Sequence, residues 1–236
     1  MYLFITNILL LFFGIGTMVT LYLNKSSHPQ QALDRWKKLG FYLLILIIIF
    51  ISIYYKFIFY IALCIGSIGI YELSIAYSKS ENKLTFFAIS IVIYLLILFG
   101  FISFINSKTS IQLCFVYLLV VTFDGFSQLS GQLFGRRKLI SKISPNKTLN
   151  GSIAGFILGT ITSLFIVEYM DISIINGLLS ATLICLSAFI GDLLASLYKR
   201  KCGIKDYSNL IPGHGGILDR FDSFIFSGSI YWFINP

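Results

Sequence analysis

The sequence predicts an all-α, polytopic integral membrane protein with about eight transmembrane helices. Of its 236 residues, 57% are hydrophobic and only 12% are charged, whereas soluble domains carry about 25% charged residues. Apolar windows of about 20 residues, long enough to cross a bilayer as a helix, recur along the whole chain. Basic residues are concentrated in alternate loops between these windows. These features argue against a soluble cytosolic enzyme and exclude a disordered chain.

The first four predicted spans lie near residues 2–23, 39–55, 57–77 and 84–105. The second and third are separated only by Tyr55 and Lys56, so the window length alone divides them into two helices. These spans carry no recognisable motif. We therefore treat residues 1–105 as an N-terminal scaffold within a single membrane domain, 1–236.

The last four predicted spans lie near residues 110–131, 151–169, 172–197 and 217–235. Two long polar loops, 132–150 and 198–216, separate them from one another. Acidic residues lie within or at the ends of three of these spans. Residues 106–236 are therefore the predicted catalytic part.

The loops alternate in charge, and this alternation predicts the orientation of the chain. Loops that follow odd-numbered spans hold 15 Lys and Arg residues, and those that follow even-numbered spans hold two. The positive-inside rule then places the odd loops in the cytoplasm and both termini outside. We expect the protein to lie in the cytoplasmic (inner) membrane. Its net charge of +8 is explained by the basic cytoplasmic loops, so no nucleic acid is expected as a partner. The four cysteines are predicted to be reduced packing residues.

Five acidic residues occur in or beside apolar spans: Glu72, Asp124, Asp192, Asp219 and Asp222. A carboxylate inside a bilayer costs about 2.5–3.5 kcal/mol on insertion scales, so each requires a partner or a task. The four aspartates lie at similar depth near the basic loops. For Glu72, at the end of its span, a packing role is the more common one.

Helical spacing brings polar side chains together on single faces. Asp219 and Asp222 are three residues apart, and Asp192, Ser196 and Lys199 follow one face of the seventh span. The aspartates outnumber Arg220, the one cation inside a span, which favours a hard divalent cation, most simply Mg²⁺, with a second cation left open. Interhelical ion pairing, for example of Asp192 with Arg220, is the alternative.

The two long loops contain residue types that suit phosphate binding. Residues 135–151 read GRRKLISKISPNKTLNG, in which Ser144, Lys147 and Thr148 accompany several basic side chains. Positive-inside charge alone would explain Arg136 and Arg137. Residues 212–216 read PGHGG, whose glycines permit close approach of the backbone to a ligand. Three further glycines at four-residue spacing, Gly151, Gly155 and Gly159, predict a helix-packing face.

Residues 196–222, SLYKRKCGIKDYSNLIPGHGGILDRFD, resemble the signature of phosphatidate cytidylyltransferases, also called CDP-diacylglycerol synthases. The fixed positions of that signature are all filled: Ser196, Lys199, Arg200, Lys205, Asp206, His214, Gly215, Gly216, Asp219, Arg220 and Asp222. A second similar block runs from Asp124 through Phe134-Gly135, Lys138-Leu139, Ser144-Pro145 and Lys147-Thr148 to Gly151. Together the two blocks cover about residues 120–225.

The resemblance implies transfer of CMP from CTP to phosphatidic acid, which yields CDP-diacylglycerol and pyrophosphate at the cytoplasmic side of the membrane. It implies Asp192, Asp219 and Asp222 as metal ligands, and Asp192, Asp219, Lys147 and Lys199 as catalytic residues. It also implies a substrate-binding set: Asp124, Ser144, Lys147, Thr148, Lys199, Arg200, Lys205, His214, Gly215, Gly216 and Arg220. Metal and cations together would neutralise two polyanionic substrates.

The chain departs from the family pattern at two places. Leu149 and Asn150 stand where relatives commonly have an aromatic residue followed by Glu or Gln, and Phe126-Ser127 stands where they often have Ala-Tyr. Three alternatives remain open on the sequence: phosphatidic acid as acceptor, another membrane lipid such as an ether lipid or a polyprenol, and an ion-coupled transporter whose acids bind cations. The sequence is compatible with a monomer and with a homodimer.

Overall fold

The computed structural model describes residues 2–25, 27–81, 83–211 and 215–235, and within them the chain is almost entirely helical. The helices are α1 (Tyr2–Asn24), α2 (Pro29–Tyr54), α3 (Ile58–Ser78), α4 (Leu84–Ser107), α5 (Ser110–Phe134), α6 (Leu149–Val167), α7 (Ile174–Lys201) and α8 (Leu218–Ile234). A hairpin of β1 (Lys138–Ile140) and β2 (Ser144–Thr148) joins α5 to α6. A 3₁₀ turn, Glu168–Met170, follows α6.

The predicted spans correspond to these helices one by one. Seven of the described helices, α1 to α7, are long and apolar enough to cross a membrane, and α8 has 17 residues, which is about 25 Å of helix. Two boundaries were predicted wrongly. Helix α2 begins at Pro29 rather than near residue 39, because a proline in its first turn starts the helix ahead of the apolar window. Helix α7 continues to Lys201, so Lys199 and Arg200 lie on a helix and not in the predicted loop 198–216.

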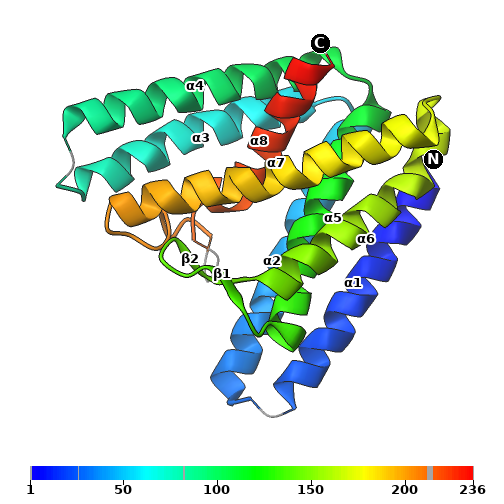
Figure 1. The fold of residues 1–236 in the computed structure, drawn as a ribbon, viewed down its shortest axis with the longest axis horizontal. Helices are drawn as coiled ribbons and strands as arrows, with labels where there is room; N and C mark the ends of the chain where they lie inside the picture. The colour runs from blue at the N-terminus through cyan, green and yellow to red at the C-terminus, as the bar shows by residue number, and fades with distance from the viewer. Residues whose placement is uncertain (1, 26, 82, 212–214, 236) are drawn as a thin grey trace.

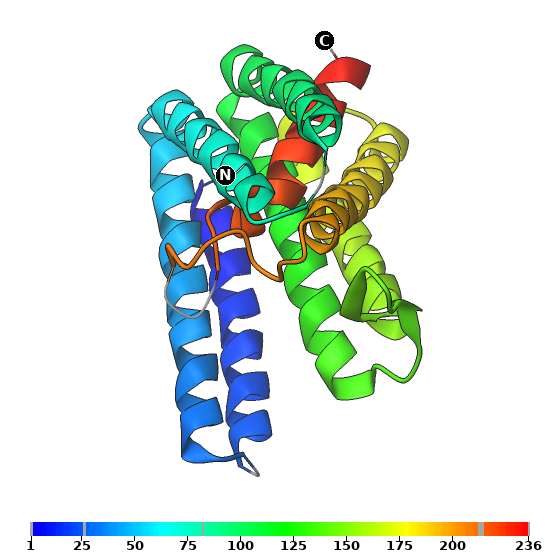
Figure 2. The same cartoon turned by 90° about the vertical axis from the view of Figure 1, so that its left-hand side faces the viewer.

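The helices form two groups that cross at a steep angle. In Figure 1, α1, α2, α5 and α6 run downwards while α3, α4 and α7 run across the picture. Figure 2 shows the second group nearly end-on and the first group upright. The N and C labels lie at the upper right of Figure 1, whereas the α1–α2 and α3–α4 turns lie at the bottom and the left. In this view both chain ends lie away from these two connections, and the orientation in the membrane stays a prediction from the charge alternation.

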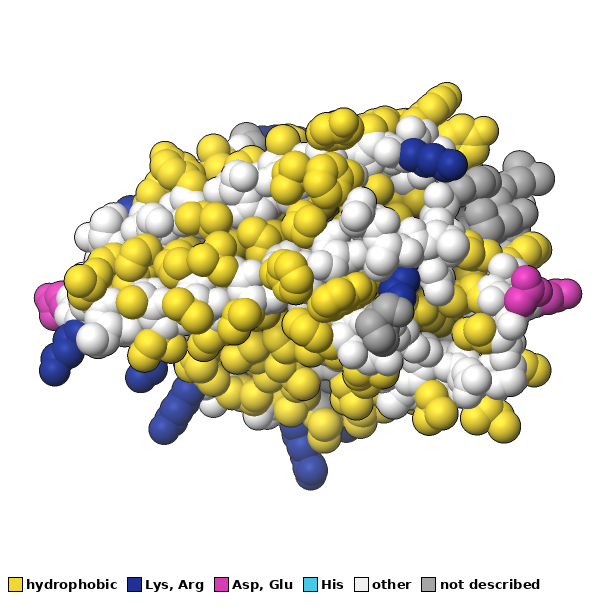
Figure 3. Space-filling view, turned by 90° about the horizontal axis from the view of Figure 1, so that it is seen from above, with side chains coloured by type: hydrophobic (Ala, Val, Ile, Leu, Met, Phe, Trp, Pro, Cys, Tyr) yellow, Lys and Arg dark blue, Asp and Glu magenta, His cyan; other side chains and the backbone are white. Residues whose placement is uncertain are grey.

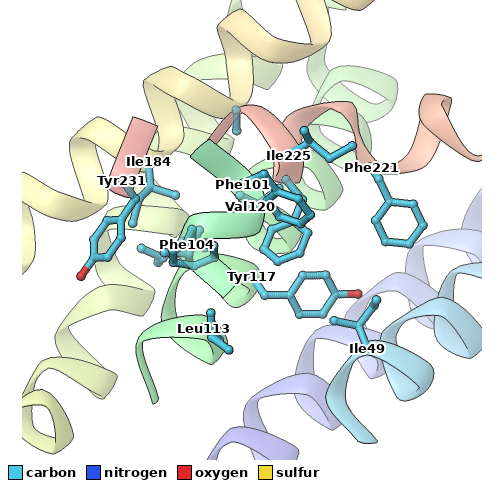
Figure 4. Packing of buried hydrophobic residues seen from close by; sticks show 14 of the residues in the cluster. Ile49, Phe101, Phe104, Leu113, Tyr117, Val120, Ile184, Phe221, Ile225 and Tyr231 are labelled. Carbon is cyan, nitrogen blue, oxygen red and sulfur yellow. The ribbon is translucent and has the colours of Figure 1, made fainter. Parts of the chain in front are cut away.

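An aromatic core joins α4, α5 and α8. The ring of Phe224 lies edge-on to Phe101, with centroids 5.1 Å apart, and edge-on to Tyr117 at 5.0 Å. Figure 4 shows the labelled rings from these three helices gathered in one cluster. A Cβ on Gly228 would lie 2.8 Å from the Phe104 ring, so a residue without a side chain is needed for this close packing of α8 against α4.

The predicted glycine face of α6 is confirmed. A Cβ on Gly151 or Gly155 would collide with the backbone of α5 near Ser127 and Phe123, and one on Gly159 would lie 2.7 Å from the sulfur of Cys185. Helices α5 and α6 therefore approach each other as closely as small residues allow. This packing fixes the start of α6, and with it the hairpin before it.

The outer surface is apolar. Figure 3 shows one face on which hydrophobic side chains cover most of the area and charged ones lie mainly at its edges. Leu, Ile and Phe side chains along α1, α2, α4 and α6 are widely exposed. Such a surface suits lipid chains rather than water, and the protein is a multi-pass integral membrane protein. All four cysteines are free; Cys114, Cys185 and Cys202 are buried, as expected of packing residues, whereas Cys64 is exposed.

Candidate active site

An ion pair joins the hairpin to the middle of α7. Lys147 Nζ lies 2.6 Å from Asp192 Oδ2, and the ammonium also stands 4.6 Å from the centre of the Phe189 ring. The other carboxylate oxygen of Asp192 accepts a hydrogen bond from Ser196 Oγ at 3.2 Å. The predicted polar face of α7 is thus present. The side chains of Lys147 and Asp192 keep 18% and 30% of their exposure, while the Lys147 ammonium nitrogen itself is buried against the carboxylate.

A second ion pair joins α7 to α8 and is more deeply buried. Lys199 Nζ donates to Asp219 Oδ1 at 2.5 Å, with 10% and 2% of the two side chains exposed. The other oxygen of Asp219 accepts from the backbone N–H groups of Gly216, at 2.8 Å, and Tyr207, at 3.0 Å. Asp219 therefore holds the loop before α8 as well as the lysine.

Tyr207, in the loop between α7 and α8, packs against this ion pair. Its hydroxyl donates to the carbonyl oxygen of Ala195 at 3.2 Å, and its ring centre lies 5.2 Å from Lys199 Nζ. Burial, reinforced by the carboxylates of Asp222 and Asp219, holds the pKa of Tyr207 well above its usual range. Tyr207 is therefore a neutral hydrogen-bond donor throughout the physiological pH range.

The remaining two aspartates lie close to the first pair. The charges of Asp124 on α5 and Asp222 on α8 interact with each other and with Asp192. The Ser223 hydroxyl hydrogen-bonds the Asp124 carboxylate, and Asp222 Oδ1 accepts from the Ser223 backbone N–H at 2.8 Å. Three helices thus bring carboxylates to one region, as their spacing predicted. Arg220 provides a further positive charge near Asp124.

The two long loops are connected by Arg200. Its guanidinium donates to the carbonyl oxygen of Ile143 in the hairpin at 3.1 Å and to that of Ile204 at 2.9 Å. The sequence had suggested Arg200 as a phosphate-binding residue, and here its donors hold the loops 135–148 and 202–217 together. Lys205, from the same predicted set, is exposed beside them.

Two other predicted ligand residues have structural contacts. Thr148 is 4% exposed and caps α6, because its hydroxyl oxygen accepts from the Gly151 backbone N–H at 3.2 Å. Ser144 is half-buried and pairs with Ile140 in the hairpin. The hairpin itself was not predicted. It places Lys147 one residue before the α6 cap, where the lysine reaches α7.

Gly215 and Gly216, the two described glycines of the 212–216 segment, are close to carboxylates of the protein itself. Gly215 has φ +87°, and a Cβ there would lie 2.8 Å from Asp219 Oδ2. A Cβ on Gly216 would collide with the carboxylate of Glu72. Their lack of a side chain thus has an internal reason besides the predicted approach to a ligand. His214 lies outside the described residues.

Glu72 was not predicted as part of the site, yet it lies directly behind it. It is completely buried in α3 and accepts hydrogen bonds from Ser208 Oγ at 2.5 Å and from the backbone N–H groups of Ile217 and Leu218, at 3.0 and 2.7 Å. An acid inside an apolar run was the only signal in the sequence. Its partners, up to 146 residues away, carry none.

The aspartates have the chemistry of ligands for a hard cation, but their arrangement does not enclose one. One carboxylate oxygen of Asp192 is paired with Lys147, and one of Asp219 is paired with Lys199. Among the described residues, no three His, Cys, Asp or Glu side chains converge closely enough to hold a metal ion. The ion pairing considered as an alternative is thus present for two of the four aspartates, with lysines rather than Arg220.

An apolar hollow lies next to the Lys147–Asp192 pair. It has a volume of about 250 Å³ and is formed between α5, α6 and α7. Its lining residues are Phe123, Ser152, Ile153, Phe156, Ile157, Cys185, Leu186 and Phe189. Phe189 belongs both to this lining and to the cation contact with Lys147. The hollow therefore ends beside a positive charge.

Fold and site together define a polytopic membrane protein with two lysine–aspartate pairs inside an apolar helix bundle. Comparison with known proteins agrees with this class. Residues 2–235 match the cytidylyltransferase family, and the chain belongs to that family.

Individual relatives carry a more specific name. The phosphatidate cytidylyltransferase of Rickettsia bellii is 33% identical over 189 residues, which is 76% of this chain and 81% of the relative. That of Staphylococcus saprophyticus subsp. saprophyticus is 39% identical over 153 residues, or 62% of this chain and 59% of the relative. The S. aureus (strain COL) protein of the same name is 37% identical over the same length. The matched segment thus spans about six tenths of the staphylococcal proteins.

Proposed function

We propose that this protein transfers CMP from CTP to phosphatidic acid and releases pyrophosphate. The observation that carries the proposal is the two Lys–Asp contacts along the C-terminal half of α7, Lys147–Asp192 and Lys199–Asp219, inside a bundle whose outer surface is apolar. Charged groups at such a location are retained for a function. Family membership and the name of the relatives indicate cytidylyl transfer as that function.

The chemistry requires neutralisation of negative charge more than it requires a base. An oxygen of the lipid phosphate attacks the α-phosphorus of CTP, and the bond from that phosphorus to the bridging oxygen of the β-phosphate breaks. The nucleophile is already an anion, so no strong general base is needed. Lys147, at the less deeply buried of the two pairs, is the residue we assign to the entering phosphates, and Lys199 and Arg220 add positive charge around the leaving pyrophosphate.

The lipid substrate has to bring its phosphate to this site from the bilayer. We propose the hollow between α5, α6 and α7 as the place where one of its acyl chains lies. The hollow is lined almost wholly by apolar side chains, and its Phe189 end meets the Lys147 ammonium. A lipid with an apolar chain and an anionic headgroup matches this combination of a hydrophobic wall and a cation.

Mg²⁺ is proposed as a cofactor on the oxygen-donor chemistry of Asp192, Asp219 and Asp222. When bound, it would supply positive charge to the phosphates. The lysine contacts of Asp192 and Asp219 do not fit a closed metal site, so none of the roles assigned above depends on the metal. A location in the inner membrane and a homodimer are further proposals. The inner-membrane location rests on the charge alternation of the loops. The homodimer rests on the sequence alone.

The decisive experiment supplies purified protein in detergent with radiolabelled CTP and phosphatidic acid, and separates lipid products by thin-layer chromatography. Labelled CDP-diacylglycerol is expected, with one pyrophosphate released for each molecule. Parallel reactions with an ether-linked phosphatidate and with a polyprenol test the rival acceptors. Preferential labelling of either rival would replace phosphatidic acid in the proposal. The family match argues against the ion-coupled transporter.

A further inference from the structure

Glu72 fixes the N-terminus of α8 from a helix that contributes no residue to the polar site. The first turn of any helix has N–H groups without partners inside the helix. In α8 the residue before the helix, Ile217, provides no side-chain cap. Glu72 of α3 instead accepts from the backbone N–H groups of Ile217 and Leu218. A carboxylate at this end also interacts favourably with the helix dipole.

The same carboxylate orders the loop before α8. Its Oε1 accepts from Ser208 Oγ at 2.5 Å as well as from Ile217. Gly216 passes so close that a side chain there would collide with Glu72. Neither ion pair that the structure describes includes Glu72. Its contacts are instead the three donors of this segment.

The next residue of α3 holds α7. Tyr198 Oη donates to the carbonyl oxygen of Leu73 at 3.0 Å. Tyr198 immediately precedes Lys199, and Leu218 immediately precedes Asp219. Two consecutive residues of α3 thus contact the two residues that adjoin the Lys199–Asp219 pair. This arrangement determines how α7 and α8 lie relative to each other where the pair forms.

We propose that Glu72 is a positioning residue for the reaction: by capping α8 it places Asp219, Arg220 and Asp222 in the polar site. It touches none of the reacting groups. The N-terminal half of the chain therefore contributes to catalysis through this contact. The kinetic part of the inference rests on the proposed function, whereas its structural part does not.

The test compares Glu72→Gln with wild type in detergent by two measurements. Glutamine keeps the size of the side chain, but its amide nitrogen cannot accept, so at least one of the three contacts is lost. Hydrogen exchange followed by mass spectrometry, without substrates, should show peptides from 203–220 exchanging at least about ten-fold faster, while α5 and α6 stay unchanged. Initial rates at saturating CTP should show kcat reduced at least about ten-fold, because small displacements of reacting groups are costly.

Two control variants separate positioning from general stability. Glu81→Gln removes an exposed carboxylate in the α3–α4 turn and should change neither measurement. Ser227→Ala removes a buried hydrogen bond from α8 to the Ile184 carbonyl; it should lower the melting temperature but leave kcat per folded molecule intact. If Glu72→Gln does not fold, Ser208→Ala removes one of the three donors and should change both measurements in the same direction, less strongly.

The outcomes are distinct. Faster exchange in 203–220 together with reduced kcat in folded protein supports the inference. Unchanged exchange there, or faster exchange with normal kcat, overturns it. Absence of turnover in the wild type would remove the proposed function, and the exchange data would still decide whether Glu72 orders α8.

Discussion

Lys147 and Asp192 meet at 2.6 Å although one lies on a two-stranded hairpin and the other inside a helix. The hairpin is held by the Thr148 cap at one end and by Arg200 at Ile143. The backbone of the hairpin therefore holds Lys147 next to α7, and the contact does not depend only on the length of the lysine side chain. A mobile surface lysine would contribute little to such a pair.

Replacing Lys147 with alanine should raise the KM for CTP or for the lipid about ten-fold or more, with a smaller effect on kcat. A hydrogen bond to a charged group contributes about 1.5–3 kcal/mol, and a contact made equally in ground and transition states appears in KM. Initial-rate kinetics with each substrate varied in turn measure the effect. Lys142→Ala, in the exposed part of the same loop, is the matched control and should behave as wild type.

Asp219→Asn should reduce kcat at least about 100-fold, because it removes charge from the centre of the site. It should also lower stability, since Lys199 then keeps a buried ammonium without its carboxylate, and breaking such a pair costs about 3–5 kcal/mol. Thermal-shift and rate measurements on the same preparation test both parts. Asp171→Asn is the control, because Asp171 has φ +53° and asparagine tolerates that conformation. A folded Asp219→Asn enzyme with normal kcat would falsify the assigned centre.

Gly216→Ala should strongly impair activity, because the new methyl group would collide with the Glu72 carboxylate. The loop has to move away from α3, and the N-terminus of α8 moves with it. Gly40→Ala on α2 is the control, since a Cβ there meets nothing within 4 Å. The two variants are compared by kcat and by melting temperature. Equal activities would show that the loop does not need its close approach to α3.

Chelation should abolish turnover, and added Mg²⁺ should restore it, if the aspartates bind a divalent cation. The assay is lipid-product formation in excess chelator, followed by titration with Mg²⁺. Full activity without free divalent cation would leave the lysines and arginines as the only source of positive charge. It would then agree with the ion-paired arrangement of Asp192 and Asp219.

Ile157→Trp should raise the KM for long-chain phosphatidic acid more than for a short-chain analogue. Ile157 lines the apolar hollow and is 51% exposed, so a larger side chain there would fill the space assigned to the acyl chain. Ile161→Trp, one turn further along α6 and outside the lining, is the control. A shift in KM that does not depend on chain length would place the acyl chain elsewhere.

The helices were predictable because each membrane span is a continuous run of apolar residues in the sequence. Where apolar length and helix length differ, the prediction was wrong. Pro29 starts α2 in a polar segment, and Lys199 and Arg200 extend α7 beyond the bilayer window. A hydrophobicity window detects the membrane, whereas a helix ends where its backbone hydrogen bonds end.

The lysines and aspartates that the structure pairs were named from the sequence, but not all of their contacts could be. Asp192 and Ser196 are four residues apart on one helix, so their hydrogen bond follows from periodicity. The partners of Lys147 and Glu72 follow only from how separate helices pack. A buried acid in an apolar segment indicates that a partner exists, and the three-dimensional structure is needed to identify it as the N-terminus of α8.

The Glu72–α8 contact also has a consequence for biogenesis. Glu72 of α3 is synthesised 145 and 146 residues before Ile217 and Leu218, whose backbone groups it binds. Until α8 docks, α3 therefore presents an unsatisfied carboxylate to the membrane interior or to trapped water. A chain whose synthesis stops before α8 keeps that defect permanently. Such a truncated chain would leave the Glu72 carboxylate without the two backbone donors of Ile217 and Leu218.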